Sequence, residues 1–312
     1  MINNNHNVFV YSQSDDYAKE LGYEGKMYTE THLNPKNDPY FWSRRLEYTL
    51  GIPLEYLKNM NVLEIGCCAG RFTMELSKHA KKVTAIDLSE AIFYNYAKGK
   101  ENVQLIKCDL FNIPKLKEPI DVVICRGVIQ HTPKPRETIK KLFDYINTGS
   151  LVIFDVYKKQ KFRAFKFKYF HRKIVPKLLS QEKFDSIIKK HTTTIYKLLQ
   201  LSHKIGTIPL IGYFFKHTPF YFPEDYKKLY RNSTQKEKHT MFLSQLHDAL
   251  YAHYDNPMTS QEVLNTLAEI NQIPYSYDLT RNIFRCKKTD NLTVTDPQFT
   301  KHGVQGIQKE KI

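Results

Sequence analysis

Residues 61–73, Asn-Val-Leu-Glu-Ile-Gly-Cys-Cys-Ala-Gly-Arg-Phe-Thr, constrain the fold more than any other stretch of the chain. An apolar run too short for a helix leads into a turn bounded by Gly66 and Gly70, and residues 72–76 then show helical spacing. This order predicts a strand, a tight turn and a helix. In such a unit the glycines let the backbone approach a ligand, and the free N–H groups of the new helix point at it.

The turn does not carry the dinucleotide-binding fingerprint, which would place glycine at 66, 68 and 71. Cysteine stands at 68 and arginine at 71. The remaining pattern, Glu64-x-Gly66-x-x-x-Gly70, resembles motif I of the class I S-adenosylmethionine (SAM) methyltransferases. The resemblance implies that Glu64 and the backbone of Gly66, Cys68 and Gly70 hold the methionine part of SAM. Cysteine fits position 68 if its φ is negative, whereas a positive φ would strain the loop or weaken SAM binding.

A second short strand, residues 82–87, ends in Asp87, which lies 23 residues after Glu64. In nucleoside-binding α/β folds a carboxylate about 20 residues past the glycine turn accepts hydrogen bonds from ribose hydroxyls. We therefore expect Asp87, with its neighbour Leu88, at the ribose. The alternative is that Asp87 only caps a turn. Ser89 is expected to cap a helix that runs to about Tyr96.

Residues 103–110 predict a third strand that closes on Cys108, Asp109 and Leu110. In the resembled family a carboxylate here binds the exocyclic amine of adenine, and neighbouring backbone meets a ring nitrogen. The resemblance therefore assigns Cys108, Asp109 and Leu110 to the adenine. The alternative is that Asp109 is an acid in a solvated turn.

The fourth strand, residues 120–125, runs into Arg-Gly-Val-Ile-Gln-His-Thr-Pro-Lys-Pro at 126–135. This run resembles the Gly-Val-x-x-His-x-x-x-Pro motif of many class I methyltransferases. The resemblance implies that Arg126 and Val128 contact the methionine part of SAM and that His131 lies on the methyl-transfer face, where it orients the acceptor or acts as a base. The alternative is that His131 only hydrogen-bonds the turn before a helix at 137–146. Tyr254 is a second catalytic candidate, or part of a structural return turn.

Strands that alternate with helical patterns predict an α/β fold with a doubly wound, mostly parallel Rossmann-like sheet. The fifth strand is expected at residues 151–157, and residues 273–279 and 282–287 fit the antiparallel hairpin that completes the family's seven-stranded sheet. Thr259-Ser260-Gln261-Glu262 is a capping box for a helix to about Ala268. Ligands of such sheets bind at the carboxyl ends of the strands.

The chain is expected to divide into four parts. Residues 1–60 form an N-terminal helical cap, 61–157 and 258–288 the SAM-binding core, 158–257 a basic helical insertion that covers the active site, and 289–312 a disordered tail. The aromatic side chains of residues 17–48 either cover the edge of the sheet or form a lid. The formal net charge is +15, and residues 158–257 carry 20 basic and 7 acidic side chains.

Residues 158–179 hold nine Lys or Arg and no acid, and aromatic residues such as Phe162, Phe165 and Phe170 lie between them. Three interpretations stay open. The segment is a solvated face with buried aromatics, an interfacial helix on anionic lipid, or a contact surface for phosphate or nucleic acid. It matches no named RNA-binding module.

The five cysteines show neither metal-ligand spacing nor the framework of a small secreted domain, so we expect buried, reduced thiols and no metal site. The first residues lack a signal-peptide pattern, and no stretch approaches about 20 apolar residues. We expect a cytoplasmic protein, and contact with the inner face of a membrane stays open.

These patterns predict a SAM-dependent methyltransferase that acts on a small metabolite or on a glycan or lipid precursor, with RNA as a less favoured acceptor. A sulfonium methyl group is already activated, so the protein mainly aligns the acceptor with it. The alternatives are a non-catalytic scaffold or regulator with the same fold, for which Cys68 would be a sign of decay, and a nicotinamide oxidoreductase, which the missing glycines disfavour. The oligomeric state is not predicted.

Overall fold

The computed structural model describes residues 8–11, 18–159, 167–216, 218 and 232–290. Within these ranges the chain forms two compact units. The core unit contains the described residues of 1–26, 40–159 and 253–290, and the helical unit those of 27–39 and 160–252. The predicted tail from 291 on, together with Phe162, Phe165 and residues 219–222, lies outside the described residues.

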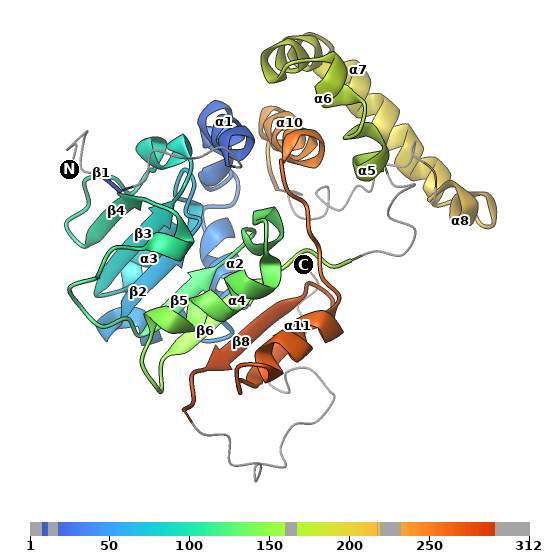
Figure 1. Ribbon diagram of the computed structural model, residues 1–312. Coiled ribbons are helices and arrows are strands. Elements are labelled where there is room, and N and C mark those ends of the chain that lie inside the picture. Colours follow the sequence, from blue (N-terminus) through green and yellow to red (C-terminus); the bar gives the residue numbers. More distant parts are fainter. Residues whose placement is uncertain (1–7, 12–17, 160–166, 217, 219–231, 291–312) are drawn as a thin grey trace. The chain divides into compact units, whose positions relative to one another are not determined.

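The core unit is built on one sheet with the strand order β1-β4-β3-β2-β5-β6-β8-β7 (Figure 1). All pairs from β1 to β6 are parallel, and β8 runs antiparallel to both β6 and β7. The predicted α/β class with a terminal antiparallel hairpin is confirmed. The strands are β1 Val8–Val10, β2 Asn61–Ile65, β3 Lys82–Asp87, β4 Val103–Lys107, β5 Val122–Cys125, β6 Leu151–Asp155, β7 Pro274–Asp278 and β8 Ile283–Lys287.

The sheet has eight strands where the sequence predicts seven. The additional strand is β1, which pairs with β4 at the edge. It has only three residues, Val-Phe-Val, inside a polar stretch. So short a run shows no alternation, and only its partner strand makes it a strand.

Helices cover both faces of the sheet. On one face, α4 (Pro135–Leu142) and α11 (Ser260–Ala268) bury apolar side chains against the strands, and β2 contributes Leu63 and Ile65 to this core. The opposite face of β2 carries Val62 and Glu64, because successive side chains of a strand alternate in direction. Glu64 therefore faces α3 (Arg71–His79), whose Thr73 donates to it. Strands that are buried on both faces explain the nearly continuous apolar runs in the sequence.

The direction of the strand order reverses between β2 and β5. From β2 the chain continues outward through β3 and β4, and it then returns to place β5 on the other side of β2. Ligands of open α/β sheets bind in the crevice that such a reversal leaves at the carboxyl ends of the strands. In this sheet the reversal falls between residue 66, after β2, and residue 126, after β5.

Helix α2 (Phe41–Leu50) ends at Gly51, which has φ = +70°. Arg285 of β8 is a charged residue buried in the sheet, and hydrogen bonds to the end of α2 satisfy its guanidinium. Its Nε donates to the carbonyl of Thr49 at 2.9 Å, and its Nη2 donates to the carbonyl of Tyr48 at 2.5 Å. A cation at the carboxyl end of a helix satisfies carbonyls that have no partner inside the helix.

Two predicted helices are shorter than expected. Ser89 caps a 3₁₀ helix, Glu90–Tyr94, instead of an α-helix. The Asn95 side chain accepts the N–H of Ala97 at 2.9 Å, and this local bond competes with continuation of the helix. In the same way α4 gives way to a 3₁₀ turn, Phe143–Tyr145. The other 3₁₀ helices are Thr29–His32, Leu54–Asn59, Leu110–Asn112 and Ile129–His131.

The described residues of the helical unit are mostly helical. Its largest elements are α7 (Gln181–Gly206) and α10 (Gln235–Tyr251), which pack against each other. The shorter helices of this unit are α5 Phe167–His171, α6 Val175–Leu178 and α8 Ile211–Phe215, and α1 Lys19–Met27 ends at the boundary between the units.

A buried polar cluster ties segment 27–39 to α7 and α10 within the helical unit. Tyr28 donates to the Asp185 carboxylate at 2.5 Å, and the Nε2 atom of His247 lies 3.4 Å from the same carboxylate. Burial alone would raise the pKa of Asp185, but the hydrogen bonds from His247, Tyr28 and Lys189 outweigh it and hold this pKa at about 2. The cluster fixes three segments that are distant in sequence.

No helix among the described residues is both long enough and apolar enough to span a bilayer. The proposed cover of the active site by residues 158–257 stays a prediction.

Candidate cofactor and acceptor site

The glycine turn after β2 lies directly against the loop after β5. Gly66 has φ = +79°, and a Cβ atom at this position would lie 2.0 Å from Cγ2 of Val128. Only glycine combines the left-handed backbone with this close approach. Gly66 follows β2 and Val128 follows β5, so these two predicted contact residues meet where the strand order reverses.

Glu64, near the carboxyl end of β2, is almost fully buried, with 4% of its surface exposed. The hydroxyl of Thr73 donates to its carboxylate at 2.6 Å, and the amide of Asn95 donates to Thr73 at 3.1 Å. Burial raises the pKa of Glu64 to about 7, opposed by the Thr73 hydrogen bond and reinforced by the charge of Asp87. The sequence analysis did not assign a role to Thr73 or Asn95, and a lone Asn beyond a strand carries no readable signal.

Cys68 adopts the left-handed conformation, with φ = +46°. A non-glycine residue in this region costs about 1–2 kcal/mol. The positive-φ alternative is therefore the correct one, and the loop is strained at this position. A hydrogen bond opposes the strain, because the Cys68 N–H donates to the Asp87 carboxylate at 2.7 Å. Helix α1 also packs tightly against Cys68, because a Cβ atom added at Gly25 would lie 2.4 Å from the Cys68 sulfur.

Asp87 uses both carboxylate oxygens to hold the neighbouring loops. Oδ2 accepts the Cys68 N–H, while Oδ1 accepts the N–H of Ser89 at 2.8 Å and its hydroxyl at 2.6 Å. Burial raises the pKa of Asp87, and these hydrogen bonds oppose the rise. The turn-capping alternative thus describes part of what Asp87 does. Each carboxylate oxygen has two lone pairs, and three of the four are used, so the arrangement leaves one acceptor position, on Oδ2, for a further donor. Leu88, partly buried, follows directly.

The three residues predicted to bind adenine, which follow β4, each make a different contact. Cys108 is buried, its N–H donates to the carbonyl of Asp87 at 3.1 Å, and burial raises the pKa of its thiol to about 12. The Asp109 carboxylate accepts the N–H of Phe111 at 2.9 Å and so caps the 3₁₀ helix that begins at Leu110. The Leu110 carbonyl accepts the hydroxyl of Tyr145. Backbone of this segment therefore lies beside Asp87, whereas the Asp109 side chain turns toward its own loop.

Arg126 lies at the carboxyl end of β5 and forms an ion pair. Its Nε is 3.5 Å from Oδ2 of Asp155, and Oδ1 of Asp155 accepts the N–H of Gly127 at 2.6 Å. The guanidinium also donates to Thr49 and lies 5.8 Å from the ring centroid of Phe72. The sequence analysis missed Asp155, although it ends its strand in the same way as Asp87 and could have been found by that rule.

His131 and Tyr254, the two predicted catalytic candidates, lie next to each other. His131 is 5% exposed, and its Nδ1 is 2.9 Å from the carbonyl oxygen of Tyr254. A carbonyl can only accept, so this hydrogen bond places the proton of neutral His131 on Nδ1 and the lone pair on Nε2. The ring of Tyr157 packs edge-on at 5.4 Å. The return segment is fixed by Asn256, whose N–H donates to the carbonyl of Gln130 at 2.7 Å.

The structure thus brings several predicted residues into direct contact, as pairs or short chains. These contacts are Gly66 with Val128, Cys68 with Asp87, Cys108 with Asp87, and His131 with Tyr254. Glu64 and Asp87 are both buried, and the charge of Asp87 adds to the rise in the pKa of Glu64. Gly70 begins α3 with φ = +92°.

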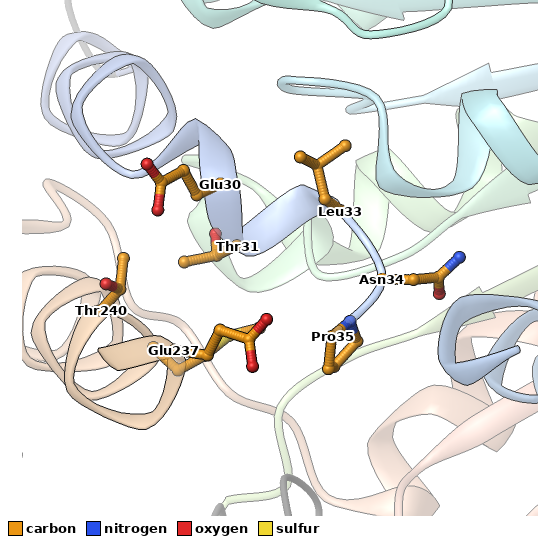
Figure 2. A pocket seen from close by; sticks show the side chains of 8 residues that line it. Glu30, Thr31, Leu33, Asn34, Pro35, Glu237 and Thr240 are labelled. Atoms are coloured by element: carbon orange, nitrogen blue, oxygen red, sulfur yellow. The ribbon is translucent and has the colours of Figure 1, made fainter. Parts of the chain in front are cut away.

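A small pocket also occurs in the helical unit, between residues 30–35 and α10 (Figure 2). Two acids line it, Glu30 and Glu237. The Glu237 carboxylate already accepts the N–H groups of Lys36 at 2.9 Å and Thr234 at 2.7 Å. This carboxylate is therefore occupied in capping α10, and we assign the pocket no chemistry.

A family model described as "Methyltransferase domain" matches residues 36–198, just over half of the chain. The chain belongs to the class I SAM-dependent methyltransferase family. SAM is the cofactor of this family. The matched range contains the Gly66 turn, Asp87, Asp109 and the Arg126–His131 run.

Curated relatives of this methyltransferase-family chain have low identity. The ubiquinone biosynthesis O-methyltransferase of Coxiella burnetii is 28% identical over 113 residues, which cover 35% of this chain and 48% of that protein. The tRNA U34 carboxymethyltransferase of Nautilia profundicola is 29% identical over 122 residues, which cover 36% of this chain and 40% of that protein. This chain therefore spans about half the length of the curated relatives it matches.

Among solved structures, the N-methyltransferase NodS of Bradyrhizobium japonicum, in complex with S-adenosyl-L-homocysteine, is 20% identical to this methyltransferase-family chain. The match covers 43% of this chain and 74% of NodS, with a TM-score of 0.34.

Proposed function

We propose that this chain transfers the methyl group of SAM to a small-molecule acceptor, with a glycan or lipid precursor as the expected class. The cluster of groups at the carboxyl ends of β2 and β3, where the strand order reverses, is the observation that carries the proposal. A glycine turn after β2, the buried Glu64 carboxylate on β2 and the Asp87 carboxylate at the end of β3 lie at one edge of the sheet. These are the groups that a nucleoside with an amino-acid tail requires.

We assign the cofactor in three parts. Glu64 and the backbone of residues 66–70 would hold the methionine part, Asp87 the ribose, and the segment 108–110 the adenine. Because the Asp109 side chain caps its own 3₁₀ helix, we expect backbone of this segment to supply much of the adenine contact. Arg126 is paired with Asp155, and we propose that it positions the loop around Val128.

Asp87→Asn is expected to weaken SAM binding about 10- to 100-fold. The amide keeps one acceptor oxygen for the Cys68 loop but loses the charge that strengthens hydrogen bonds from ribose hydroxyls. Isothermal titration calorimetry with SAM measures the change. We choose Asn rather than Ala, because Ala would also remove three hydrogen bonds that hold the loops.

Ser89→Ala is the matched control for Asp87→Asn. It removes the Ser89 hydroxyl bond to Asp87 and the N-cap, which costs about 1 kcal/mol of stability. It leaves the carboxylate in place, so SAM affinity should change little. Equal loss of affinity in both variants would show that Asp87 acts only through the loop.

His131 is the proposed proton acceptor for the methyl acceptor group, with Nε2 as the reacting atom. His131→Gln should lower kcat about 10²–10⁴-fold and leave the SAM dissociation constant unchanged. The acceptor is first identified by screening metabolite and lipid-precursor fractions with labelled SAM, and kcat is then measured across pH. Tyr254→Phe is the comparison variant, since it keeps the carbonyl that orients His131. If His131→Gln keeps the wild-type kcat at every pH, His131 has a purely structural role.

RNA methylation is the second candidate function. A similarity to a tRNA U34 carboxymethyltransferase and the net charge of residues 158–257 favour it.

The proposal also includes contact of segment 158–179 with an anionic membrane. A non-catalytic scaffold is separated from an enzyme by a thermal-shift titration with SAM, because a ligand that binds the folded state must stabilise it.

A further inference from the structure

The end of α7, the following turn and α8 expose a group of large apolar side chains. Leu210 is 79% exposed, Ile211 61% and Phe214 68%. Ile208 and Tyr213, also exposed, belong to the same short stretch. We call Ile208, Leu210, Ile211, Tyr213 and Phe214 the apolar tip. Soluble proteins rarely leave so many apolar side chains of one short stretch in water, and such patches mark contact sites.

Helix α7 carries a regular row of lysines. Lys183, Lys190, Lys197 and Lys204 are seven residues apart, and all four are exposed. A spacing of seven is close to two helical turns, so the four side chains share one face with a drift of about 20° per step. The row is about 32 Å long, since a helix rises 1.5 Å per residue. We call these four residues the lysine row.

The lysine row and the apolar tip are separate from the packing face of α7. That face buries Phe184, Ile188 and Tyr196. Leu198 and Leu201 are exposed and follow Lys197 on the adjoining side of the helix. From residue 186 to residue 216 the chain has five lysines and neither Asp nor Glu.

We propose that the lysine row and the apolar tip bind an anionic lipid bilayer, with the tip inserted at the level of the headgroups. Aliphatic and aromatic side chains next to a row of lysines are typical of segments that lie in the membrane interface. Each lysine near an anionic surface strengthens binding about fivefold. The proposal does not depend on methyl transfer.

Two other partners fit the surface less well. A second copy of the chain would bring one lysine row against another, and like charges in contact disfavour association. Nucleic acid would satisfy the lysines, but Leu210 and Ile211 gain nothing from phosphate and cannot stack on bases as aromatic rings do. Anionic lipid satisfies both the charges and the apolar side chains.

This surface differs from the segment 158–179 that the sequence singles out. In that segment Arg172 stabilises the helical unit. Its guanidinium donates to the carbonyls of Asp248 and Ala249 at 2.9 Å, near the carboxyl end of α10. The lysine row lies along α7 instead, and its pattern becomes visible once α7 is known to be one helix from 181 to 206.

The test is co-sedimentation of the full chain with vesicles of equal parts phosphatidylcholine and phosphatidylglycerol, compared with vesicles of phosphatidylcholine alone. We expect binding to the anionic vesicles that weakens with added salt. The double variant Leu210→Ser and Phe214→Ser should bind about tenfold or more weakly, because each residue loses an apolar burial in the bilayer. The triple variant Lys190→Gln, Lys197→Gln and Lys204→Gln should lose about 100-fold and most of the salt dependence.

Matched controls come from exposed residues of the core unit. Tyr40→Ser with Tyr56→Ser removes two apolar side chains of 68% and 65% exposure, and Lys58→Gln with Lys115→Gln and Lys117→Gln removes three exposed charges. Both should bind as wild type does, and circular dichroism should show all variants folded. Equal binding by the tip variant and wild type, no binding of wild type to anionic vesicles, or a salt-sensitive preference for tRNA over vesicles would each overturn the proposal. Self-association that the tip variant abolishes would also overturn it.

Discussion

Gly66→Ala is expected to lower the free energy of unfolding by about 2–5 kcal/mol. A residue with a Cβ atom costs about 1–2 kcal/mol at the left-handed φ of +79°. The same Cβ would lie 2.0 Å from Cγ2 of Val128, so this partly buried side chain has to move, and such overpacking costs about 1–3 kcal/mol. Urea unfolding followed by circular dichroism measures the change.

Gly99→Ala separates the two causes. Gly99 also has a positive φ, +87°, but nothing lies within 4 Å of its added Cβ. This variant should lose only the backbone part, about 1–2 kcal/mol. Adding Val128→Ala to Gly66→Ala should recover part of the packing loss and none of the backbone loss. If Gly66→Ala costs no more than Gly99→Ala, the close approach between the β2 turn and the β5 loop is refuted.

The second large effect is the pH dependence of stability that Glu64 produces. Its pKa is 4.5 when exposed and about 7 when buried. Between these values the folded state binds a proton that the unfolded state has lost, so stability falls as pH rises. The difference of about 2.5 pKa units at 1.36 kcal/mol each gives about 3 kcal/mol. This contribution is fully present below pH 4.5 and is lost as the pH rises through about 7.

Glu64→Gln removes this slope, because glutamine stays neutral and can still accept the Thr73 hydroxyl. Urea unfolding at several pH values from about 4.5 to 8 compares the two proteins, and the variant should be the more stable one at the upper end. Glu118→Gln is the control. Lys82 lowers the pKa of Glu118, so any effect of that carboxylate has the opposite sign. Parallel pH profiles for wild type and Glu64→Gln would contradict the prediction.

The same carboxylate links SAM binding to pH if it holds the methionine part. A cation near Glu64 favours its ionised form, so binding below about pH 7 should release a proton. Calorimetry in buffers of different ionisation enthalpy detects this release, and Glu64→Gln should abolish it.

Local sequence determined most of the sheet. Short apolar runs bounded by glycine and acid predicted seven of the eight strands, because strands buried on both faces are read as continuous apolar stretches. The rule that parallel strands present their carboxyl ends together predicted from the sequence alone that Gly66, Asp87, Asp109 and Arg126 lie at one edge. The seven-residue period of the lysine row was also present in the sequence.

Tertiary structure decided what those residues touch. Asp87 holds the Cys68 N–H, Asp155 pairs with Arg126, and Asn95 supports Thr73, and each contact joins residues at least 19 positions apart. The sign of φ at Cys68 could not be read from the sequence, because it depends on the hydrogen bond from that residue to Asp87. Likewise, Val8–Val10 forms strand β1 only because it pairs with β4. Propensity and periodicity act over neighbouring residues, whereas burial, pKa and side-chain pairing are set by groups that only the folded chain brings together.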